Sequence, residues 1–230
     1  MKTPIHHNSS RTSDTLILLQ THGGVDPALE RHWPWLLRGG CDVLVTSPED
    51  DPALRRGLVV GKVIRKVPQD YYRLQERLVM ALEKVRGLHG GYKDLLVLHY
   101  DSVLLGPVGA KNSPGLDTRL DESKEGFIAP LNSTPPWWFD WETLEKFLKA
   151  AALHPINFEG GFLDRWVAAI CFLHRIPMTQ TSLIGYGRNN VSDDWPEVEK
   201  SIRSGFPLVH GIKTEAELKH VLEVAKEVGK

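Results

Sequence analysis

Short apolar runs alternate with segments of helical periodicity along the first half of this chain. Runs of this kind, continuous and without helical spacing, are typical of strands buried on both faces. They are residues 15–21 (TLILLQT), 42–47 (DVLVTS) and 95–98 (LLVL). Residues 71–87 carry an apolar stripe at helical spacing that ends at a glycine, and we expect a further helix at residues 28–37 and a strand at residues 58–67. The alternation predicts an α/β fold with a mostly parallel, twisted central sheet and helices on both faces.

The second half of the chain has a different pattern. Residues 108–124 are polar and rich in turn-forming residues, so we expect a surface loop there. Further elements are expected as a strand at residues 126–131 and helices at residues 140–153, 161–174 and 214–228. Thr214 and Glu217 form a capping-box pattern at the start of the last helix. A chain of 230 residues fits one large domain, which we place at residues 14–230 after a flexible segment at residues 1–13.

The charge balance and the cysteines restrict the partners and the compartment. Lys and Arg number 28 against 29 Asp and Glu, a formal net charge of -1, which argues against nucleic acid as the main partner. Cys41 and Cys171 lie in apolar surroundings without the spacing of a metal site, so we expect buried free thiols in a reducing compartment. No apolar run reaches the roughly 18 residues of a membrane span, and the first residues lack a signal-peptide core. We therefore expect a cytoplasmic protein.

Residues 94–105 (DLLVLHYDSVLL) place an acidic side chain at the end of a buried strand. A buried Asp101 without a partner would be costly, so it needs a metal ion, a cation or hydrogen-bond donors. Ligands of open α/β sheets bind at the carboxyl ends of the strands. His99 and Asp101 stand two positions apart, so both side chains can face one ion. The alternative is an aspartate that caps a turn beside a hydrogen-bonded histidine.

Three segments in a fixed order resemble the layout of the GT-A class of nucleotide-sugar glycosyltransferases. They are residues 99–101 (HYD), 159–166 (EGGFLDRW) and 209–213 (VHGIK). In that class a Rossmann-like first half ends in a DxD signature, an acidic motif begins a helix near the acceptor, and a late histidine often completes the metal site. The resemblance implies a single GT-A-like domain with a nucleotide-binding half at residues 14–107 and an acceptor-binding half at residues 108–230. It implies transfer of a sugar from a nucleoside diphosphate, expected to be UDP, to a hydroxyl of a saccharide or small acceptor.

The same resemblance implies a metal and donor site. Asp101, His99 and His210 would hold Mn2+ or Mg2+ against the diphosphate. His99 replaces the first acid of the signature, and imidazole suits Mn2+ better than Mg2+. Lys213 would neutralise the diphosphate leaving group. The other donor-binding residues implied are Thr21, His22, Ser47, Asp50, Asp51 and Tyr100.

Glu159 and Asp164 are the candidates for the base that activates the acceptor hydroxyl. Inverting members of the class place an acid at the start of this helix, where the helix dipole favours a carboxylate. We expect Asp164 to be the base, with Glu159 accepting a hydrogen bond from a substrate hydroxyl or serving as an alternative base. The structural alternative makes Glu159 a cap and pairs Asp164 with Arg165 or Arg188.

Residues 135–141 (PPWWFDW) are expected to form a loop at the acceptor site. Trp137, Trp138 and Trp141 offer large apolar faces that could stack on sugar rings. A core position for these rings is the alternative, although two adjacent tryptophans in a loop cannot easily both be buried.

Two other functions fit the same fold. A sugar nucleotidyltransferase is one, but residues 20–31 (QTHGGVDPALER) match its glycine-rich phosphate loop poorly. A non-catalytic nucleotide- or saccharide-binding module is the other, and the histidine in place of the first acid at His99 favours it. Turnover of UDP-sugar with Mn2+ would separate these functions from a glycosyltransferase.

Overall fold

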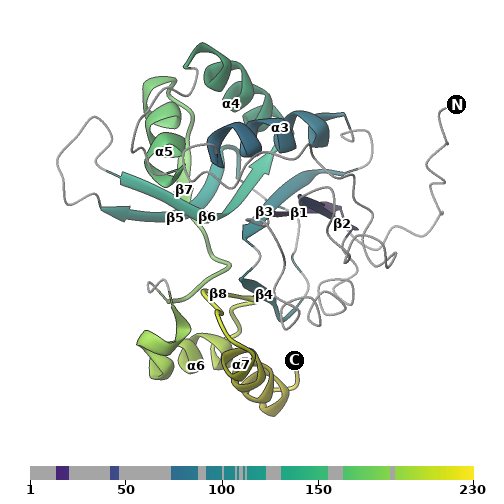
Figure 1. Ribbon diagram of the computed structural model, residues 1–230, viewed down its shortest axis with the longest axis vertical. Helices are drawn as coiled ribbons and strands as arrows, with labels where there is room; N and C mark the ends of the chain where they lie inside the picture. Colours follow the sequence, from purple (N-terminus) through teal and green to yellow (C-terminus); the bar gives the residue numbers. More distant parts are fainter. Residues whose placement is uncertain are drawn as a thin grey trace, which may run out of the picture.

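The centre of the molecule is a mixed six-stranded sheet in the order β2-β1-β3-β6-β5-β7 (Figure 1). The structure, a computed structural model, describes residues 14–20, 42–46, 74–87, 92–99, 101–106, 108, 111, 113–122, 131–154, 163–186 and 190–230. The six strands are β1 (Thr15–Gln20), β2 (Asp42–Thr46), β3 (Asp94–His99), β5 (Leu116–Glu122), β6 (Leu131–Asp140) and β7 (Met178–Gln180). A second sheet pairs β4 (Ser102–Leu104) with β8 (Leu208–His210) in antiparallel orientation.

The strand directions confirm the α/β class and show where the sheet is not parallel. β1 runs parallel to β2 and β3, and β5 runs parallel to β7. β6 lies between β3 and β5 and is antiparallel to both. Since β1, β2 and β3 share one direction, their carboxyl ends meet at the same edge of the sheet.

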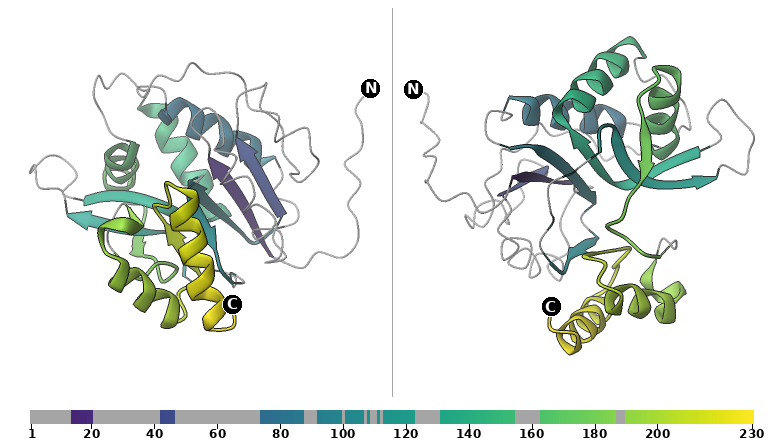
Figure 2. Two further views of the ribbon diagram at one scale, coloured as in Figure 1. Left: turned by 60° about the horizontal axis from the view of Figure 1, so that its bottom comes forward. Right: turned by 180° about the vertical axis from the view of Figure 1, so that it is seen from behind.

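The described helices form two groups. They are α3 (Leu74–Arg86), α4 (Trp141–Leu153), α5 (Leu163–Leu173), α6 (Trp195–Arg203) and α7 (Glu215–Glu227), with a short 3-10 turn η4 (Val191–Asp193) before α6. α3, α4 and α5 pack on one face of the six-stranded sheet, while α6 and α7 lie with the two-stranded sheet at the other side (Figures 1 and 2). None of these helices is long and apolar enough to cross a membrane.

The expectation of helices on both faces of the central sheet needs correction for the described residues. The face opposite α3, α4 and α5 packs against the two-stranded sheet, through Leu104 and Leu208. Val103 and Val209, the neighbouring residues in the same two strands, point the other way into the core formed with α6 and α7. Because side chains alternate along a strand, this small sheet is apolar on both faces and serves as the covering layer.

Most elements expected from periodicity are present. The structure confirms strands at β1, β2 and β3, and helices at α3, α4, α5 and α7. The capping box of Thr214 and Glu217 at α7 is formed as expected. Cys171 is a buried free thiol, and burial raises its pKa to about 12. The flexible segment at residues 1–13, the helix at residues 28–37, the strand at residues 58–67 and Cys41 lie outside the described residues.

The prediction of a surface loop at residues 108–124 is wrong for its second part, which forms β5. Leu116, Thr118 and Arg119 are buried there. The polar side chains are tolerated because they are paired across to β6: Thr118 donates to the carbonyl of Thr134 at 2.7 Å, and Arg119 Nε donates to Thr134 Oγ1 at 2.8 Å. Polarity indicated a loop, but satisfied hydrogen bonds allow a polar strand inside a sheet.

Candidate metal centre

The end of β3 and the end of β8 meet through the two-stranded sheet. β3 ends at His99, and Asp101 occupies the turn that leads into β4. β4 pairs with β8 in a register that sets Ser102 opposite His210. This pairing brings His210 beside Asp101, at the edge of the central sheet where the parallel strands β1, β2 and β3 end.

A tight turn after His210 wraps around Asp101. Gly211 adopts a φ of 88°, in the left-handed region that favours glycine. The backbone N–H groups of Gly211 and Ile212 then donate to the carbonyl oxygen of Asp101, at 3.1 and 3.0 Å. The turn carries the chain back so that the ammonium group of Lys213 donates to Asp101 Oδ2. The position of Lys213 is therefore set by backbone contacts to the same aspartate.

Three side chains converge with donor atoms that suit a metal ion. One ligand atom each from His99, Asp101 and His210 can be chosen so that all three lie within 4.8 Å of one another. Asp101 and His210 are only 2% and 7% exposed. His210 Nε2 lies 3.3 Å from Asp101 Oδ1, yet within the described part of the chain neither Asp101 Oδ1 nor a ring nitrogen of His210 makes a hydrogen bond. Buried polar atoms in this situation are costly unless they bind something, so the cluster fits a cation.

The electrostatic environment sets the protonation states that a metal requires. Burial raises the pKa of Asp101, but the neighbouring His210, His99 and Lys213 outweigh it, and the net shift is downward. Burial lowers the pKa of His210 against the opposing charge of Asp101, and the positive charges of Arg119 and Lys213 lower it further. At neutral pH the cluster therefore offers a carboxylate and a neutral imidazole, which are the forms that ligate metals.

The donor set indicates which ions fit. Two imidazoles and one carboxylate suit Mn2+, Fe2+ or Zn2+, whereas Mg2+ and Ca2+ prefer oxygen ligands throughout. A set of three protein ligands leaves coordination positions open for oxygen atoms of a substrate. His99, Asp101 and His210 would thus be the residues that hold the ion.

Two residues near the cluster are not distinguished by any motif. Tyr186 accepts a hydrogen bond from the backbone N–H of His210 through its hydroxyl group. Arg119, on β5, is 4% exposed and lies close enough to lower the pKa of His210. The alternation of Leu116, Thr118 and Leu120 is the only sequence signal that could have placed Arg119 in a strand.

The tryptophan pair has a structural place that differs from the expected loop. Trp137 and Trp138 lie in β6 and are 0% and 6% exposed. Because adjacent residues of a strand face opposite sides, Trp137 packs in the core under α3, α4 and α5, whereas Trp138 packs toward the two-stranded sheet. The loop prediction is wrong and the core alternative is confirmed. Neither ring presents an open face to a saccharide.

Trp137 nevertheless contacts one residue of the candidate metal centre. The His99 ring meets the Trp137 ring edge-on, with centroids 6.1 Å apart and an interplanar angle of 82°. The same imidazole lies 5.8 Å from the ring of His210. Trp137 thus supports the orientation of His99, a role that follows from packing rather than from contact with a ligand.

Of the remaining expected site residues, the structure describes Asp164 alone. Asp164 lies half-buried in the first turn of α5 and does not belong to the His99, Asp101 and His210 group. Seven others lie outside the described residues, namely Thr21, His22, Ser47, Asp50, Asp51, Tyr100 and Glu159.

Comparison of the chain with protein-family models and with curated protein sequences finds no match.

Proposed function

We propose that this protein is a metal-dependent glycosyltransferase. It takes a sugar from a nucleoside diphosphate sugar, with UDP as the expected nucleotide, and transfers it to a hydroxyl of a saccharide or small acceptor, as a GT-A-like domain. The observation that carries the proposal is the convergence of His99, Asp101 and His210 at the carboxyl end of β3, with Lys213 in contact with Asp101. Ligands of open α/β sheets bind at this edge.

The charges around the cluster support a diphosphate as the ligand. A divalent ion on the three ligands would bind oxygen atoms of the diphosphate and neutralise the charge that develops on the leaving group. Lys213 is 43% exposed along its side chain and adds a positive charge at the rim. Mn2+ is the expected ion, because the two imidazoles disfavour Mg2+.

Asp164 is the proposed base for the acceptor hydroxyl. Its place in the first turn of α5 supports this role, since a helix N-terminus stabilises a carboxylate. We propose that Glu159 accepts a hydrogen bond from a hydroxyl of the substrate. The variant Asp164→Asn should keep donor binding and lose about a hundredfold or more in kcat.

Thermal stabilisation by nucleotides, with and without Mn2+, tests the metal site. Addition of UDP with Mn2+ should raise the unfolding temperature of the parent protein. The same addition should not change the unfolding temperature of the Asp101→Asn variant. Asp94→Asn is the matched control, because Asp94 is as buried as Asp101 but lies at the start of β3, at the end of the strand away from the cluster; it should respond as the parent does. Stabilisation of Asp101→Asn equal to that of the parent, or none of the parent by any nucleotide sugar, would contradict the proposal.

A second function is favoured by the donor set itself. Two histidines and one carboxylate also form the iron site of non-haem Fe(II) oxygenases. Oxygen consumption by the Fe2+-loaded protein, with no response to nucleotides, would support that chemistry instead. Stabilisation by UDP-sugar with Mn2+ but without release of UDP would indicate the non-catalytic binding module.

A further inference from the structure

The ammonium group of Lys213 sits on a carboxylate that the metal would need. It donates to Asp101 Oδ2, while Asp101 Oδ1 faces Nε2 of His210. We propose that Lys213 and the divalent ion compete for Asp101, and that a nucleoside diphosphate relieves the competition by taking Lys213 as its own counter-ion. Metal and nucleotide would then bind cooperatively. This inference rests on the proposed function and adds to it a coupling between metal binding and nucleotide binding.

The competition follows from the charges at Asp101. Its carboxylate is the single anionic ligand of the cluster, and the ion pair with Lys213 already neutralises it. A divalent ion bound between Oδ1 and the two imidazoles would lie only a few ångströms from the ammonium group. Like charges so close, in a site this buried, repel strongly. The ion alone should therefore bind weakly as long as Lys213 stays on Asp101.

The side-chain ammonium group of Lys213 can change its hydrogen-bond partner while the backbone of Lys213 stays in place. Its backbone N–H donates to Glu217 Oε2 at 2.6 Å, and the same oxygen accepts from the backbone N–H of Thr214 at 2.9 Å. The side chain, by contrast, is 43% exposed, against 3% for the side chain of Asp101. The ammonium group can thus turn toward an anion at the rim by side-chain rotation alone.

Arg119 is not suited to this exchange. It is buried, and its Nε donates to Thr134 Oγ1 at 2.8 Å, so its charge is held in place on β5. Of the two cations whose charge acts on His210, Lys213 is the one with an exposed side chain.

Metal binding and nucleotide binding are thermodynamically linked, and this linkage sets the size of the expected effect. If a nucleoside diphosphate raises the affinity for the metal by drawing Lys213 away from Asp101, the metal must raise the affinity for the nucleotide by the same factor. A charge-assisted hydrogen bond of this kind corresponds to a factor on the order of ten. Removing the ammonium group should therefore tighten metal binding and remove the part of the coupling that depends on Lys213, while the part due to direct contact between ion and diphosphate remains.

Measuring Mn2+ binding to the full chain, with and without saturating UDP, tests the competition between Lys213 and the ion. The electron paramagnetic resonance signal of free Mn2+ reports the amount that is not bound. The parent should bind Mn2+ about tenfold more tightly when UDP is present. Lys213→Met should bind Mn2+ alone about tenfold more tightly than the parent, and its gain from UDP should be smaller than that of the parent, because only the direct contact between ion and diphosphate still couples the two. Lys213→Arg, which keeps a cation at this position, should retain the coupling of the parent. Lys219→Met is the matched control, because it removes the same charge from an exposed position on α7.

The outcomes separate this inference from the proposed function. UDP-dependent Mn2+ binding by the parent, with the same affinities in Lys213→Met, would overturn the competition and leave the proposed function standing. Equal tightening in Lys219→Met would also overturn it, because the effect would then be one of net charge. No Mn2+ binding by the parent, with or without UDP, would overturn both.

Discussion

Trp137 and Trp138 show how one residue step changes the surroundings of a side chain. Trp137 points into the core beneath α3, α4 and α5, where its Nε1 donates to the carbonyl and the hydroxyl of Ser133, both at 3.1 Å. Trp138 points to the opposite side, against Leu104 and Leu208 of the two-stranded sheet. Each ring fills a different core, so both tryptophans act in stability.

Trp138→Ala should lower the free energy of unfolding by about 3–5 kcal/mol, because it leaves a large cavity between the two sheets. Urea unfolding followed by circular dichroism measures this loss. Leu153→Ala is the control, since Leu153 is 70% exposed and its truncation should change stability by less than about 0.5 kcal/mol. A Trp138→Ala variant of unchanged stability and raised KM for an acceptor would contradict the core assignment.

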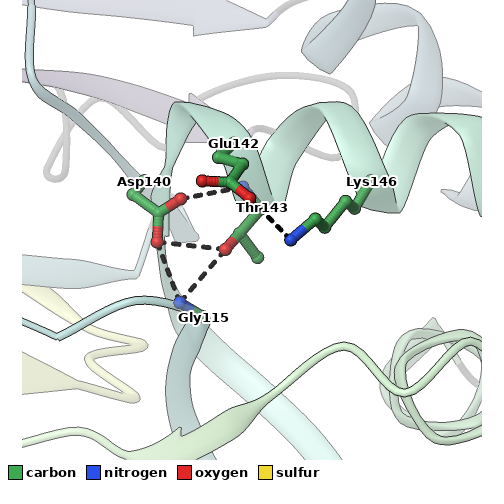
Figure 3. A network of polar contacts seen from close by, with 5 residues as sticks. All are labelled: Gly115, Asp140, Glu142, Thr143 and Lys146. Carbon is green, nitrogen blue, oxygen red and sulfur yellow. Dashed lines mark hydrogen bonds and ion pairs between the residues drawn. The ribbon is translucent and has the colours of Figure 1, made fainter.

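The start of α4 is fixed by a hydrogen-bond network that also holds the start of β5 (Figure 3). Asp140 Oδ1 accepts from the backbone N–H of Thr143 at 2.8 Å, and its Oδ2 accepts from the N–H of Gly115, also at 2.8 Å. Gly115 has a φ of 109°, and a Cβ there would lie 2.7 Å from the carbonyl oxygen of Pro177. One carboxylate thus joins a helix cap to a turn that requires glycine.

Asp140→Ala should destabilise the protein by about 2 kcal/mol, because it removes the cap of α4 and the shorter of the two hydrogen bonds that the N–H of Gly115 donates, leaving that N–H only Thr143 Oγ1 at 3.1 Å. Asp194→Ala is the matched control at α6, where the cap is one longer hydrogen bond of 3.4 Å to the N–H of Glu197, and we expect a cost of about 0.5 kcal/mol there. Thermal unfolding measures both variants. Equal losses would show that the link to Gly115 adds nothing.

The cluster of His99, Asp101 and His210 joins the two sheets that the described residues form. His99 belongs to the six-stranded sheet and His210 to the two-stranded sheet, with Asp101 in the connection between β3 and β4. An ion held by all three would tie the core beneath α3, α4 and α5 to the one formed with α6 and α7.

Hydrogen exchange measures this link. At Mn2+ and UDP concentrations about a hundredfold above their dissociation constants, amides of both β3 and β8 should exchange up to about a hundredfold more slowly where exchange requires the site to open. The Asp101→Asn variant should show no such change. Slower exchange in β8 alone would mean that His99 is not a ligand.

Local pattern determined much of this protein from the sequence alone. The strands β1, β2 and β3 and the helices α3, α4, α5 and α7 lie where the sequence pattern predicted them. A strand buried on both faces needs a continuous apolar run, and a helix buried on one face needs apolar residues at the helical period. Asp101, an acid at the end of a buried strand, was likewise visible as a group that needs a partner.

Only the tertiary structure decided which distant segments pair. The insertion of β6 between β3 and β5 buried both tryptophans, and the pairing of β4 with β8 brought His210 and Lys213 to Asp101. Arg119 lies buried in the sheet, where its Nε donates to Thr134 on the facing strand. Strand pairing depends on contacts between residues far apart in the chain, and such contacts leave no local periodicity in the sequence. The sequence therefore shows which side chains carry possible metal-ligand atoms, and only the tertiary structure determines which of these side chains come together.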